Sequence, residues 1–435
     1  MHPSGPPSPA GRPPSASAAV VPPQGEVPDG ARDLVVVGGG IVGLAVAWRA
    51  ARAGLTVTVL DPAPGDGATH AAAGMLAPVT EADFGEDDAL RLHLAAGALW
   101  PGFAADLRAA TGADVGLRTA GTLTLAYDAD DLALVRRLLA LHAAHGLASH
   151  ELTVVEARRR EPYLGPRVAG AAWAPADHAV DPRAVHAALL AALADPAGDA
   201  SRHGARAVVV RAAATRLERD PAGHVVGVHD DGGRLHAAGA VVVAAGWESG
   251  ALLRDVPGVD VPTRPVKGQT LRLDAGPDLA LEHVVRGVVQ GRPVYVVPRA
   301  VAADGPRAGH REVVVGATTE ENPDDRRATA GGVFALLRDA RALLPGIDEA
   351  ALVDVTPRAR PATPDNLPLV GATAVPGLHV ATGHGRNGIL LAPLTADAVV
   401  AGLTGAGLPP DAAAALDPAR AHRFAAPALH TTTPR

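Results

Sequence analysis

The stretch Leu34-Val35-Val36-Val37-Gly38-Gly39-Gly40-Ile41-Val42-Gly43 decides the fold of this chain. Its first four residues are apolar, which predicts a central strand of a parallel sheet that is covered on both faces. Its last six residues match the pattern G-x-G-x-x-G. A helix is predicted from Leu44 to Arg52, and a second strand from Thr56 to Leu60. Strand, glycine loop, helix and strand in this order are typical of a dinucleotide-binding unit.

Each glycine of the motif has a mechanical role. Gly38 permits the tight turn, Gly40 lets the backbone approach a pyrophosphate, and Gly43 lets helix and strand pack closely. The amino end of the helix offers free N–H groups and a partial positive charge to phosphates. Asp61, 18 residues after Gly43, is placed to accept hydrogen bonds from a ribose diol. A purely structural glycine turn is the alternative, and the motif alone does not separate NAD from FAD.

Another buried strand is predicted over Ala240-Val241-Val242-Val243-Ala244-Ala245-Gly246. It ends in small residues, which would let the end of the strand lie close under a cofactor. An ordinary core strand followed by a turn glycine explains the same pattern, so this segment supports the nucleotide site without deciding it.

Composition excludes several classes of function. The 435 residues suggest two or three domains. A net charge of −7 disfavours a dedicated nucleic-acid binder, which needs a basic face. The chain has no Cys, which removes disulfides, thiolate metal sites, cysteine nucleophiles and any cysteinyl-linked cofactor. Lys267 is the only lysine, and we expect a strand residue there rather than a Schiff base.

Both ends of the chain are expected to lie outside the folded core. Residues 1–31, rich in Pro, Gly, Ser and Ala, predict a disordered tail without the pattern of a signal peptide. The Ala/Pro-rich end, 406–435, is expected to fray. The apolar stretch from Leu34 to Trp48 has 15 residues, whereas a bilayer-spanning helix needs about 20. We therefore expect a soluble, cytoplasmic protein.

The remaining segments predict a second unit of different architecture. Strand character without crossover helices favours an antiparallel sheet; the segments are Leu117–Tyr127, Thr263–Leu273, His283–Val297 and Glu312–Thr318. Helices are predicted over Asp87–Thr111, Asp130–His145 and Asp181–Ala194. The expected fold is α/β, a Rossmann-type nucleotide domain with a discontinuous α+β substrate domain. We place the first in 32–85, 150–250 and 355–405, and the second in 86–149 and 251–354.

From about Asp33 to Gly402 the sequence resembles the D-amino-acid oxidase family of FAD-dependent amine oxidoreductases, and within it the glycine oxidases. Besides the glycine loop with Asp61, three motifs carry the resemblance. They are Ala71-Ala72-Ala73-Gly74-Met75-Leu76, Arg360-Pro361-Ala362-Thr363-Pro364-Asp365-Asn366-Leu367-Pro368-Leu369-Val370-Gly371, and Gly383-His384-Gly385-Arg386-Asn387-Gly388-Ile389-Leu390-Leu391-Ala392-Pro393.

The resemblance implies FAD, held non-covalently because there is no Cys to tether it. The implied FAD-binding residues are Gly38, Gly40, Ile41, Val42, Gly43, Asp61, Pro62, Ala68, Thr69, Ala73, Gly74, Met75, Ala214, Gly246, His384, Gly385, Arg386, Asn387, Gly388, Ile389 and Leu390. The alignment at Ala214 is loose. Asp61 stands where many relatives have Glu, and Ala359 precedes Arg360 where glycine is common.

The substrate residues implied by the resemblance are Arg360, Tyr295 and Arg386. A guanidinium grips a carboxylate with two parallel hydrogen bonds, and Arg360 is assigned this role. Arg358 is the rival if the register differs. The Tyr295 hydroxyl can meet a carboxylate or the ring can pack as a strand aromatic, and Arg386 emerges from a glycine-rich turn. No general base is evident, so no catalytic residue is assigned.

The implied reaction is oxidative deamination of glycine or a small amino acid by hydride transfer to the flavin. Glycine, oxygen and water would give glyoxylate, ammonia and hydrogen peroxide, with the imine also able to feed the thiazole of thiamine. Oxygen is the expected acceptor, a homo-oligomer is an open option, and neither nucleic acid nor a membrane is an expected partner.

Three alternatives stay open. Within the fold, the substrate could be a larger D-amino acid or sarcosine. A tRNA-modifying oxidoreductase is disfavoured by the charge of −7. A flavin-binding protein without turnover is the third. His142 and His145 lie one helical turn apart but have no third ligand nearby, so a solvated helix face is favoured over a metal site, and no metal is expected.

Overall fold

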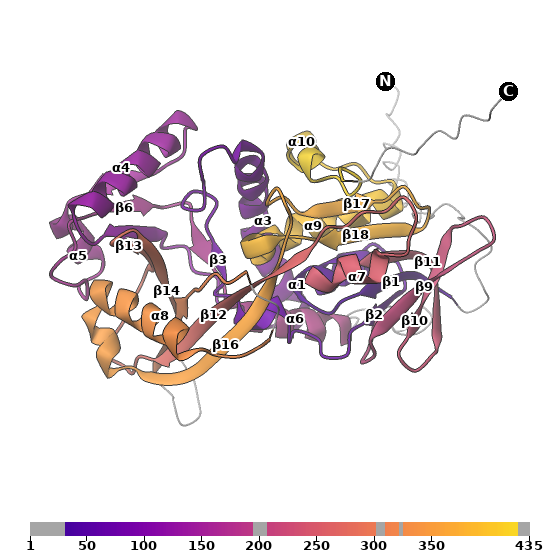
Figure 1. Ribbon diagram of the computed structural model, residues 1–435, viewed down its shortest axis with the longest axis horizontal. Coiled ribbons are helices and arrows are strands. Elements are labelled where there is room, and N and C mark those ends of the chain that lie inside the picture. Colours follow the sequence, from indigo (N-terminus) through magenta and orange to yellow (C-terminus); the bar gives the residue numbers. More distant parts are fainter. Residues whose placement is uncertain (1–30, 195–206, 302–308, 322–324, 425–435) are drawn as a thin grey trace, which may run out of the picture.

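The computed structural model describes residues 31–194, 207–301, 309–321 and 325–424. Two large sheets stand next to each other along the long axis of the molecule (Figure 1). The first carries the glycine loop and the second carries Arg360 and Tyr295. The expected combination of a Rossmann-type unit with a largely antiparallel unit is confirmed.

The first sheet has eight strands and is parallel around its centre. Its main path runs β17-β18-β11-β1-β2-β8, in which β17 alone is antiparallel to its neighbour, and β10 and β9 extend it as an antiparallel pair from β11. The bounds are β1 Arg32–Val37, β2 Val57–Leu60, β8 Ala207–Val210, β9 Ala214–Arg219, β10 Val225–Asp230, β11 Leu235–Val243, β17 Leu369–Ala372 and β18 Leu378–Thr382.

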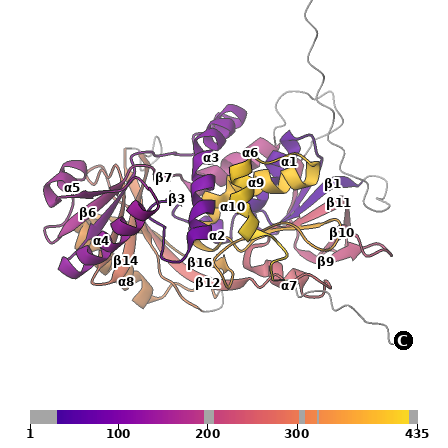
Figure 2. The same cartoon turned by 90° about the horizontal axis from the view of Figure 1, so that it is seen from above.

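Both faces of this sheet are covered, as the apolar run of β1 predicts. Leu34 and Val36 belong to a core shared with a layer of helices, whereas Val35 and Val37 belong to a core on the other face. Figure 2 shows the helical layer on one side of the strands and α7 on the other. The helices of this unit are α1 Ile41–Arg52, α3 Asp87–Thr111, α6 Pro182–Ala194, α7 Ser249–Leu253, α9 Gly388–Thr404 and α10 Pro410–Leu416.

The second sheet also has eight strands, in the order β16-β12-β15-β14-β13-β4-β6-β5. Every neighbouring pair is antiparallel except β13 with β4. The bounds are β4 Thr122–Ala126, β5 His150–Leu152, β6 Gly170–Ala174, β12 Arg264–Asp274, β13 Val284–Val289, β14 Arg292–Val301, β15 Arg311–Gly316 and β16 Ala351–Ala362.

One face of the second sheet is a core covered by helices, and the other face meets the nucleotide unit. The covering helices are α5 Val154–Arg160 and α8 Ala330–Leu343. Helix α4 Ala129–Ala144 packs instead on Ala126 and Ala172, which belong to the opposite face. On the opposite face a small cluster joins Val297 and Val314 of the sheet to Ala73 and Met75. The short elements near this junction are α2 Ala68–Ala71, β3 Met75–Leu76, β7 His178–Ala179, η1 Gly246–Glu248 and η4 Gly385–Asn387. Two others lie elsewhere: η3 Pro345–Glu349 packs in the helix-covered core of the second sheet, and η5 Asp417–Ala419 packs in the nucleotide unit.

Three segments belong to a different unit from the one expected from the sequence. Helix α3 has the expected ends, but it packs in the core of the nucleotide unit, where Phe103 meets Trp48 edge-on at 5.3 Å between ring centroids. Strands β5 and β6, and most of β16, lie in the second sheet instead of the first. Strand pairing partners are set by contacts distant in sequence, so the local pattern does not reveal them.

The ends of the chain also differ from expectation where they are described. Within 406–424, α10 and η5 are helical, and Ala419 and Ala421 are buried. Arg423 anchors this segment by binding both carboxylate oxygens of Asp365 at 2.8 Å. The end is therefore folded as far as residue 424. The predicted tail, 1–31, lies outside the described residues apart from Ala31.

The longest apolar helix is not the one singled out in the sequence. Gly385–Thr404, with mean hydropathy 1.4, is long and apolar enough to cross a membrane by length and composition. In the structure α9 packs against α1 and α3, and its residues from Ile389 to Ala396 are all buried. Its apolar character is thus accounted for by the protein core.

Candidate functional site

The glycine loop connects β1 to α1 with no room for side chains at two of its positions. Gly38 has φ +110°, and a β-carbon there would lie 2.7 Å from the carbonyl carbon of Ala244. A β-carbon on Gly43 would collide with the backbone of Gly38. At Gly40 the nearest atom to such a carbon is the hydroxyl of Thr69, at 3.4 Å. The surrounding protein therefore leaves no space for a side chain at Gly38 or Gly43, and more space at Gly40.

Residues from other segments form hydrogen bonds with the glycine loop and the amino end of α1. The first N–H to bond within the helix is that of Leu44, to the carbonyl of Gly40, which leaves the preceding N–H groups for other acceptors. The Thr69 hydroxyl accepts the Ile41 N–H at 3.0 Å. His186 of α6 contacts the Gly39 carbonyl at 2.9 Å. The predicted residues Thr69 and Ile41 thus lie together.

Asp61 follows β2 directly and faces the same loop. Its Oδ2 accepts the Gly39 N–H at 2.6 Å, and its Oδ1 accepts the Ala63 N–H at 2.7 Å. Both oxygens keep a further lone pair, since a carboxylate offers about four acceptor positions. The carboxylate is therefore fixed beside the glycine loop, with Pro62 exposed directly after it.

The other predicted segments of the nucleotide unit follow the carboxyl ends of β11 and β18. These strands are parallel to β1, so their ends meet at one edge of the sheet. The Thr382 hydroxyl donates to the Gly246 carbonyl at 2.7 Å and joins the two segments. Ala214 begins β9 and packs, partly buried, against the hydrophobic cluster that contains Leu60. The sequence-predicted residues are thus gathered at the carboxyl edge of the parallel sheet.

His384 is directed into the protein rather than toward the site. Its Nε2 contacts the Thr395 hydroxyl of α9 at 2.9 Å, and the side chain is buried. Burial lowers the pKa of His384 to about 3, so the imidazole is neutral at physiological pH. The ring therefore links the residue before the turn Gly385–Asn387 to α9.

The loop at Ala73 and Gly74 connects the two units. Gly74 has φ +79°, and a β-carbon there would lie 2.7 Å from Cδ of Pro182. Arg299 of β14 donates to the Ala73 carbonyl at 2.7 Å and to the Val180 carbonyl at 3.2 Å. The Thr270 hydroxyl of β12 donates to the Ala71 carbonyl at 2.9 Å. Hydrogen bonds from the second sheet therefore fix this loop, which lies between Ala68 and Met75 in the sequence.

One row of paired residues crosses the second sheet on its cofactor-facing side. Arg286, Tyr295, Gly316, Thr270 and Thr356 are neighbours in register on β13, β14, β15, β12 and β16. Directly opposed residues share a face of a sheet, and so do residues two apart on one strand. Arg358 and Arg360 therefore continue this face along β16.

Arg360 is half-buried and lies flat on the sheet. Its Cζ is 2.6 Å from where a β-carbon of Gly268 would be, so only glycine at 268 leaves room for the guanidinium. Nη1 donates to the Thr318 carbonyl at 3.3 Å. Among the described residues no carboxylate lies within 4.0 Å of this guanidinium. Arg358, the rival, binds Asp66 at 2.6 Å instead.

Tyr295 lies next to Gly316 in the same manner. Its Cε2 is 2.7 Å from the position of an absent β-carbon at Gly316. The ring packs in the cluster that contains Met75 and Ala73. Burial raises the pKa of the Tyr295 hydroxyl, and the charge of Arg360 acts in the opposite direction. The phenol therefore stays protonated and can donate a hydrogen bond close to Arg360.

Arg386 is compensated by acids that the sequence analysis did not identify. Its Nε lies 2.6 Å from Oε2 of Glu81, and Glu86 is 3.8 Å away. Glu81 is buried and also pairs with Arg286. Burial raises the pKa of Glu81, but the charges of Arg286 and Arg386 outweigh it and hold this pKa below its usual value. The single negative charge of Glu81 thus compensates part of the positive charge of both Arg286 and Arg386.

Asp177 positions the turn that carries Glu81. It is fully buried and accepts the N–H groups of Val79 and Thr80 at 2.9 and 3.1 Å and the Thr80 hydroxyl at 2.5 Å. Burial raises the pKa of Asp177 to about 6. Asp177 lies almost 100 residues from this turn in sequence, and no spacing pattern links the two.

Comparison with known families decides the identity of the chain. The model of the family described as FAD dependent oxidoreductase matches residues 33–401. The chain belongs to this family. A glycine oxidase from Geobacillus kaustophilus (strain HTA426) is 35% identical over 367 residues, which cover 83% of this chain and 90% of that protein. The crystal structure of glycine oxidase from Geobacillus kaustophilus matches with a TM-score of 0.79 at 32% identity, covering 91% of this chain and 99% of that one.

A second relative shows a different overall length. The bifunctional protein ThiO/ThiG from Nostoc sp. (strain PCC 7120 / SAG 25.82 / UTEX 2576) is 33% identical over 367 residues, which are 84% of this chain and 51% of that protein. The oxidoreductase chain thus spans about half the length of this relative.

FAD is the cofactor of this oxidoreductase, as the resemblance implied, and the geometry fits it. The backbone cradle at Gly38 and Gly43, the N–H groups that follow Ile41 in the first turn of α1 and the carboxylate of Asp61 suit a pyrophosphate and a ribose. Within the described ranges no group of three or more His, Cys, Asp or Glu side chains is arranged to hold a metal ion. Lys267 is buried and paired with Asp325 at 2.6 Å.

Proposed function

We propose that this oxidoreductase catalyses the FAD-dependent oxidative deamination of glycine or another small amino acid. Glycine, oxygen and water give glyoxylate, ammonia and hydrogen peroxide. The observation that carries the proposal is Arg360, a half-buried guanidinium without a carboxylate partner among the described residues, on the sheet face that meets the cofactor loops. Relatives named glycine oxidase support the choice of substrate.

In this proposal the FAD-binding residues are those gathered at the carboxyl edge of the parallel sheet. The glycine loop and the start of α1 hold the pyrophosphate, and Asp61 holds the ribose. The loop at Ala73 to Met75 and the turn at Gly385 to Asn387 flank the flavin ring. When bound there, FAD would supply the acceptor for the hydride of the substrate α-carbon, and oxygen would be the final acceptor of the electrons.

Arg360 binds the substrate carboxylate through two parallel hydrogen bonds, and the Tyr295 hydroxyl donates a further one. Arg386 contributes less positive charge, because Glu81 compensates it. The site then offers one uncompensated cation to one carboxylate, which suits a zwitterion with a single acid group. His384 is directed away and neutral, so no side chain near the site is assigned as general base, and the ammonium group of the substrate loses its proton before the hydride leaves.

Three finer points belong to the same proposal. Oxygen is the acceptor, the protein acts in the cytoplasm, and its glycine imine supplies the thiazole of thiamine. The likeness to ThiO/ThiG supports the last point. A homo-oligomer is compatible with the fold and is to be measured by sedimentation.

Anaerobic bleaching of the flavin tests the proposal. The purified protein is mixed in separate experiments with glycine, sarcosine or D-alanine without oxygen, and the visible absorbance of the flavin is followed. Rapid bleaching by glycine, followed by glyoxylate and peroxide once air is admitted, is expected. Bleaching by D-alanine alone would assign a larger D-amino acid as substrate. Yellow protein that no amine bleaches would refute catalysis.

A further inference from the structure

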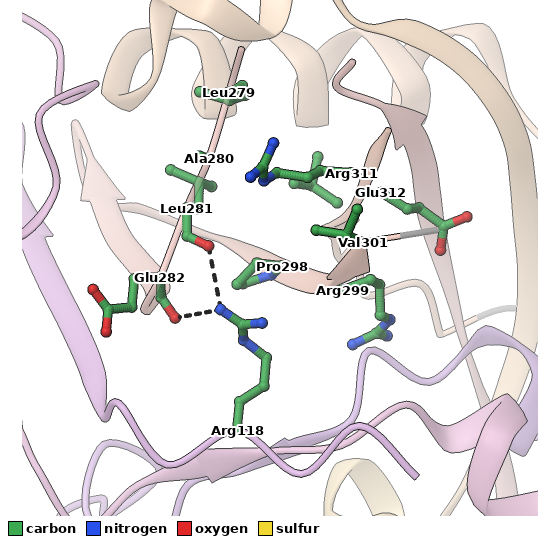
Figure 3. Close-up of a pocket in the computed structure, with 11 residues that line it drawn as sticks. Arg118, Leu279, Ala280, Leu281, Glu282, Pro298, Arg299, Val301, Arg311 and Glu312 are labelled. Carbon is green, nitrogen blue, oxygen red and sulfur yellow. Dashed lines mark hydrogen bonds between the residues drawn. The ribbon is translucent and has the colours of Figure 1, made fainter. Parts of the chain in front are cut away.

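A cavity of about 290 Å³ lies at the end of β14, beside the start of β15, and none of the proposed substrate residues lines it (Figure 3). Five of the residues that line it are charged: Arg118, Glu282, Arg299, Arg311 and Glu312. Three of these residues are arginines, and they come from three separate segments of the chain.

The three guanidiniums donate mainly to backbone carbonyls. Among the described residues the only carboxylate within 4.0 Å of any of them is Asp181, 3.9 Å from Nε of Arg299. The carbonyl acceptors are Leu281 and Glu282 for Arg118, Val180 and Ala73 for Arg299, and Pro277 for Arg311. A carbonyl satisfies an N–H group but leaves the positive charge uncompensated.

Two of these arginines also hold a buried N–H without an acceptor. Nε of Arg118 and Nε of Arg299 have no hydrogen-bond partner among the described residues, and Arg299 is only 7% exposed. Burial lowers the pKa of Arg299 to about 10, so the side chain is still charged at physiological pH although it has lost most of its water. An unpaired donor on a desolvated cation is costly unless an acceptor reaches it.

The two acids of the lining do not fill this role. Figure 3 shows the carboxylates of Glu282 and Glu312 at opposite margins of the cavity, pointing away from the three guanidiniums. Glu312 is paired with Arg272, which does not line the cavity. The cavity is therefore a local region of positive charge in a chain whose net charge is −7.

We propose that this cavity binds a small oxyanion, either a phosphate or a short carboxylate. The planar fork of arginine matches both groups, and the volume is at the small end of the range for ligand sites, roughly 300 Å³ and upward. The anion accepts hydrogen bonds from the guanidinium groups that line the cavity and compensates their charge. Since Arg299 also holds the Ala73 carbonyl, a bound anion stabilises the contact between the second sheet and the cofactor loop.

Calorimetric titration of the FAD-loaded protein tests this site. Inorganic phosphate is titrated in one series and acetate in another, with chloride keeping the ionic strength constant. Saturable binding of either anion is expected, and the stronger binder identifies the chemistry. Arg118→Gln and Arg311→Gln should each weaken binding by about tenfold or more, because each removes a charge-assisted donor. No saturable binding of either anion would overturn the proposal.

Matched variants separate this cavity from other anion sites. Arg341→Gln, at an exposed arginine of α8 paired with Asp348, should bind the anion as the parent does. Arg360→Ala should also retain it, and loss of binding there would place the anion in the substrate site. Undiminished binding by Arg118→Gln/Arg311→Gln would reveal an adventitious ion only. FAD content checks folding, and if Arg118→Gln fails to fold, the partly exposed Arg311 carries the comparison.

Discussion

The guanidinium of Arg360 lies over Gly268, with its Cζ 2.6 Å from the position that a β-carbon would occupy. The two residues are diagonal neighbours, since Gly268 pairs with Arg358 and Arg360 pairs with Val266 across β12 and β16. Arg360 is therefore held flat on the sheet by the absence of a side chain on the neighbouring strand. Gly268 acts as a positioning residue for the carboxylate site that we propose.

Gly268→Ala is expected to raise KM for glycine by about tenfold or more, with FAD content unchanged, because the methyl group displaces the guanidinium and loses roughly one charge-assisted hydrogen bond. Steady-state peroxide formation measures the change. Gly331→Ala is the matched control, because no atom lies within 4 Å of the added carbon there. In an Arg360→Ala background the substitution should have little further effect; two additive losses would contradict the link between the residues.

Arg360→Ala is expected to lower kcat/KM by roughly thirtyfold to several thousandfold, which corresponds to about 2–5 kcal/mol for a buried charge pair. Folding and the flavin spectrum should be retained, because this guanidinium makes one long hydrogen bond to the protein. Arg341→Ala serves as the surface control. Kinetics equal to the parent protein would remove Arg360 from the site and return attention to Arg358.

Gly38→Ala is expected to yield protein with little bound FAD. The residue has φ +110°, and its new β-carbon would overlap the backbone at Ala244. The loop can relieve this overlap only by moving away from Ala244, which displaces the backbone that is to bind the pyrophosphate. Absorbance of the purified protein measures flavin content, and Gly67→Ala, with open space around the added carbon, is the control. Full occupancy in Gly38→Ala would show that the loop tolerates a side chain.

Buried histidines make stability dependent on pH. Burial lowers the pKa of His93 to about 4 and that of His384 to about 3, from 6.5. An unfolded chain binds these protons first as pH falls, so their contribution to stability is complete above pH 6.5 and is lost toward pH 4. Each should cost about 2 kcal/mol of unfolding free energy between pH 6.5 and pH 5.

Urea unfolding at several pH values between 7.5 and 5 measures this loss. His93→Asn should flatten the dependence, because Asn has no proton to bind. His150→Asn, at an exposed histidine, should leave it as in the parent protein. An equally steep dependence in His93→Asn would contradict the assignment of the loss to burial of His93.

Local sequence determined the nucleotide-binding half of this protein. Three features are close in sequence: the run from Leu34 to Gly43, the helix after it and the acid at Asp61. Each depends mainly on the backbone preferences of residues adjacent in the chain. The helix over Asp87–Thr111 was likewise predicted with its observed ends. The sequence did not predict the domain to which that helix belongs, because the packing of Phe103 on Trp48 joins residues more than 50 positions apart.

Only the tertiary structure showed how the residues of the proposed substrate site are positioned. Gly268 and Gly316 give no signal in the sequence, yet they set where Arg360 and Tyr295 lie, because strand register brings them together. The same holds for Glu81, which pairs with Arg286 and Arg386 from two distant segments. Charge compensation depends on distance in space. The sequence could therefore name the arginines, and only the fold could distinguish the paired ones from the unpaired one.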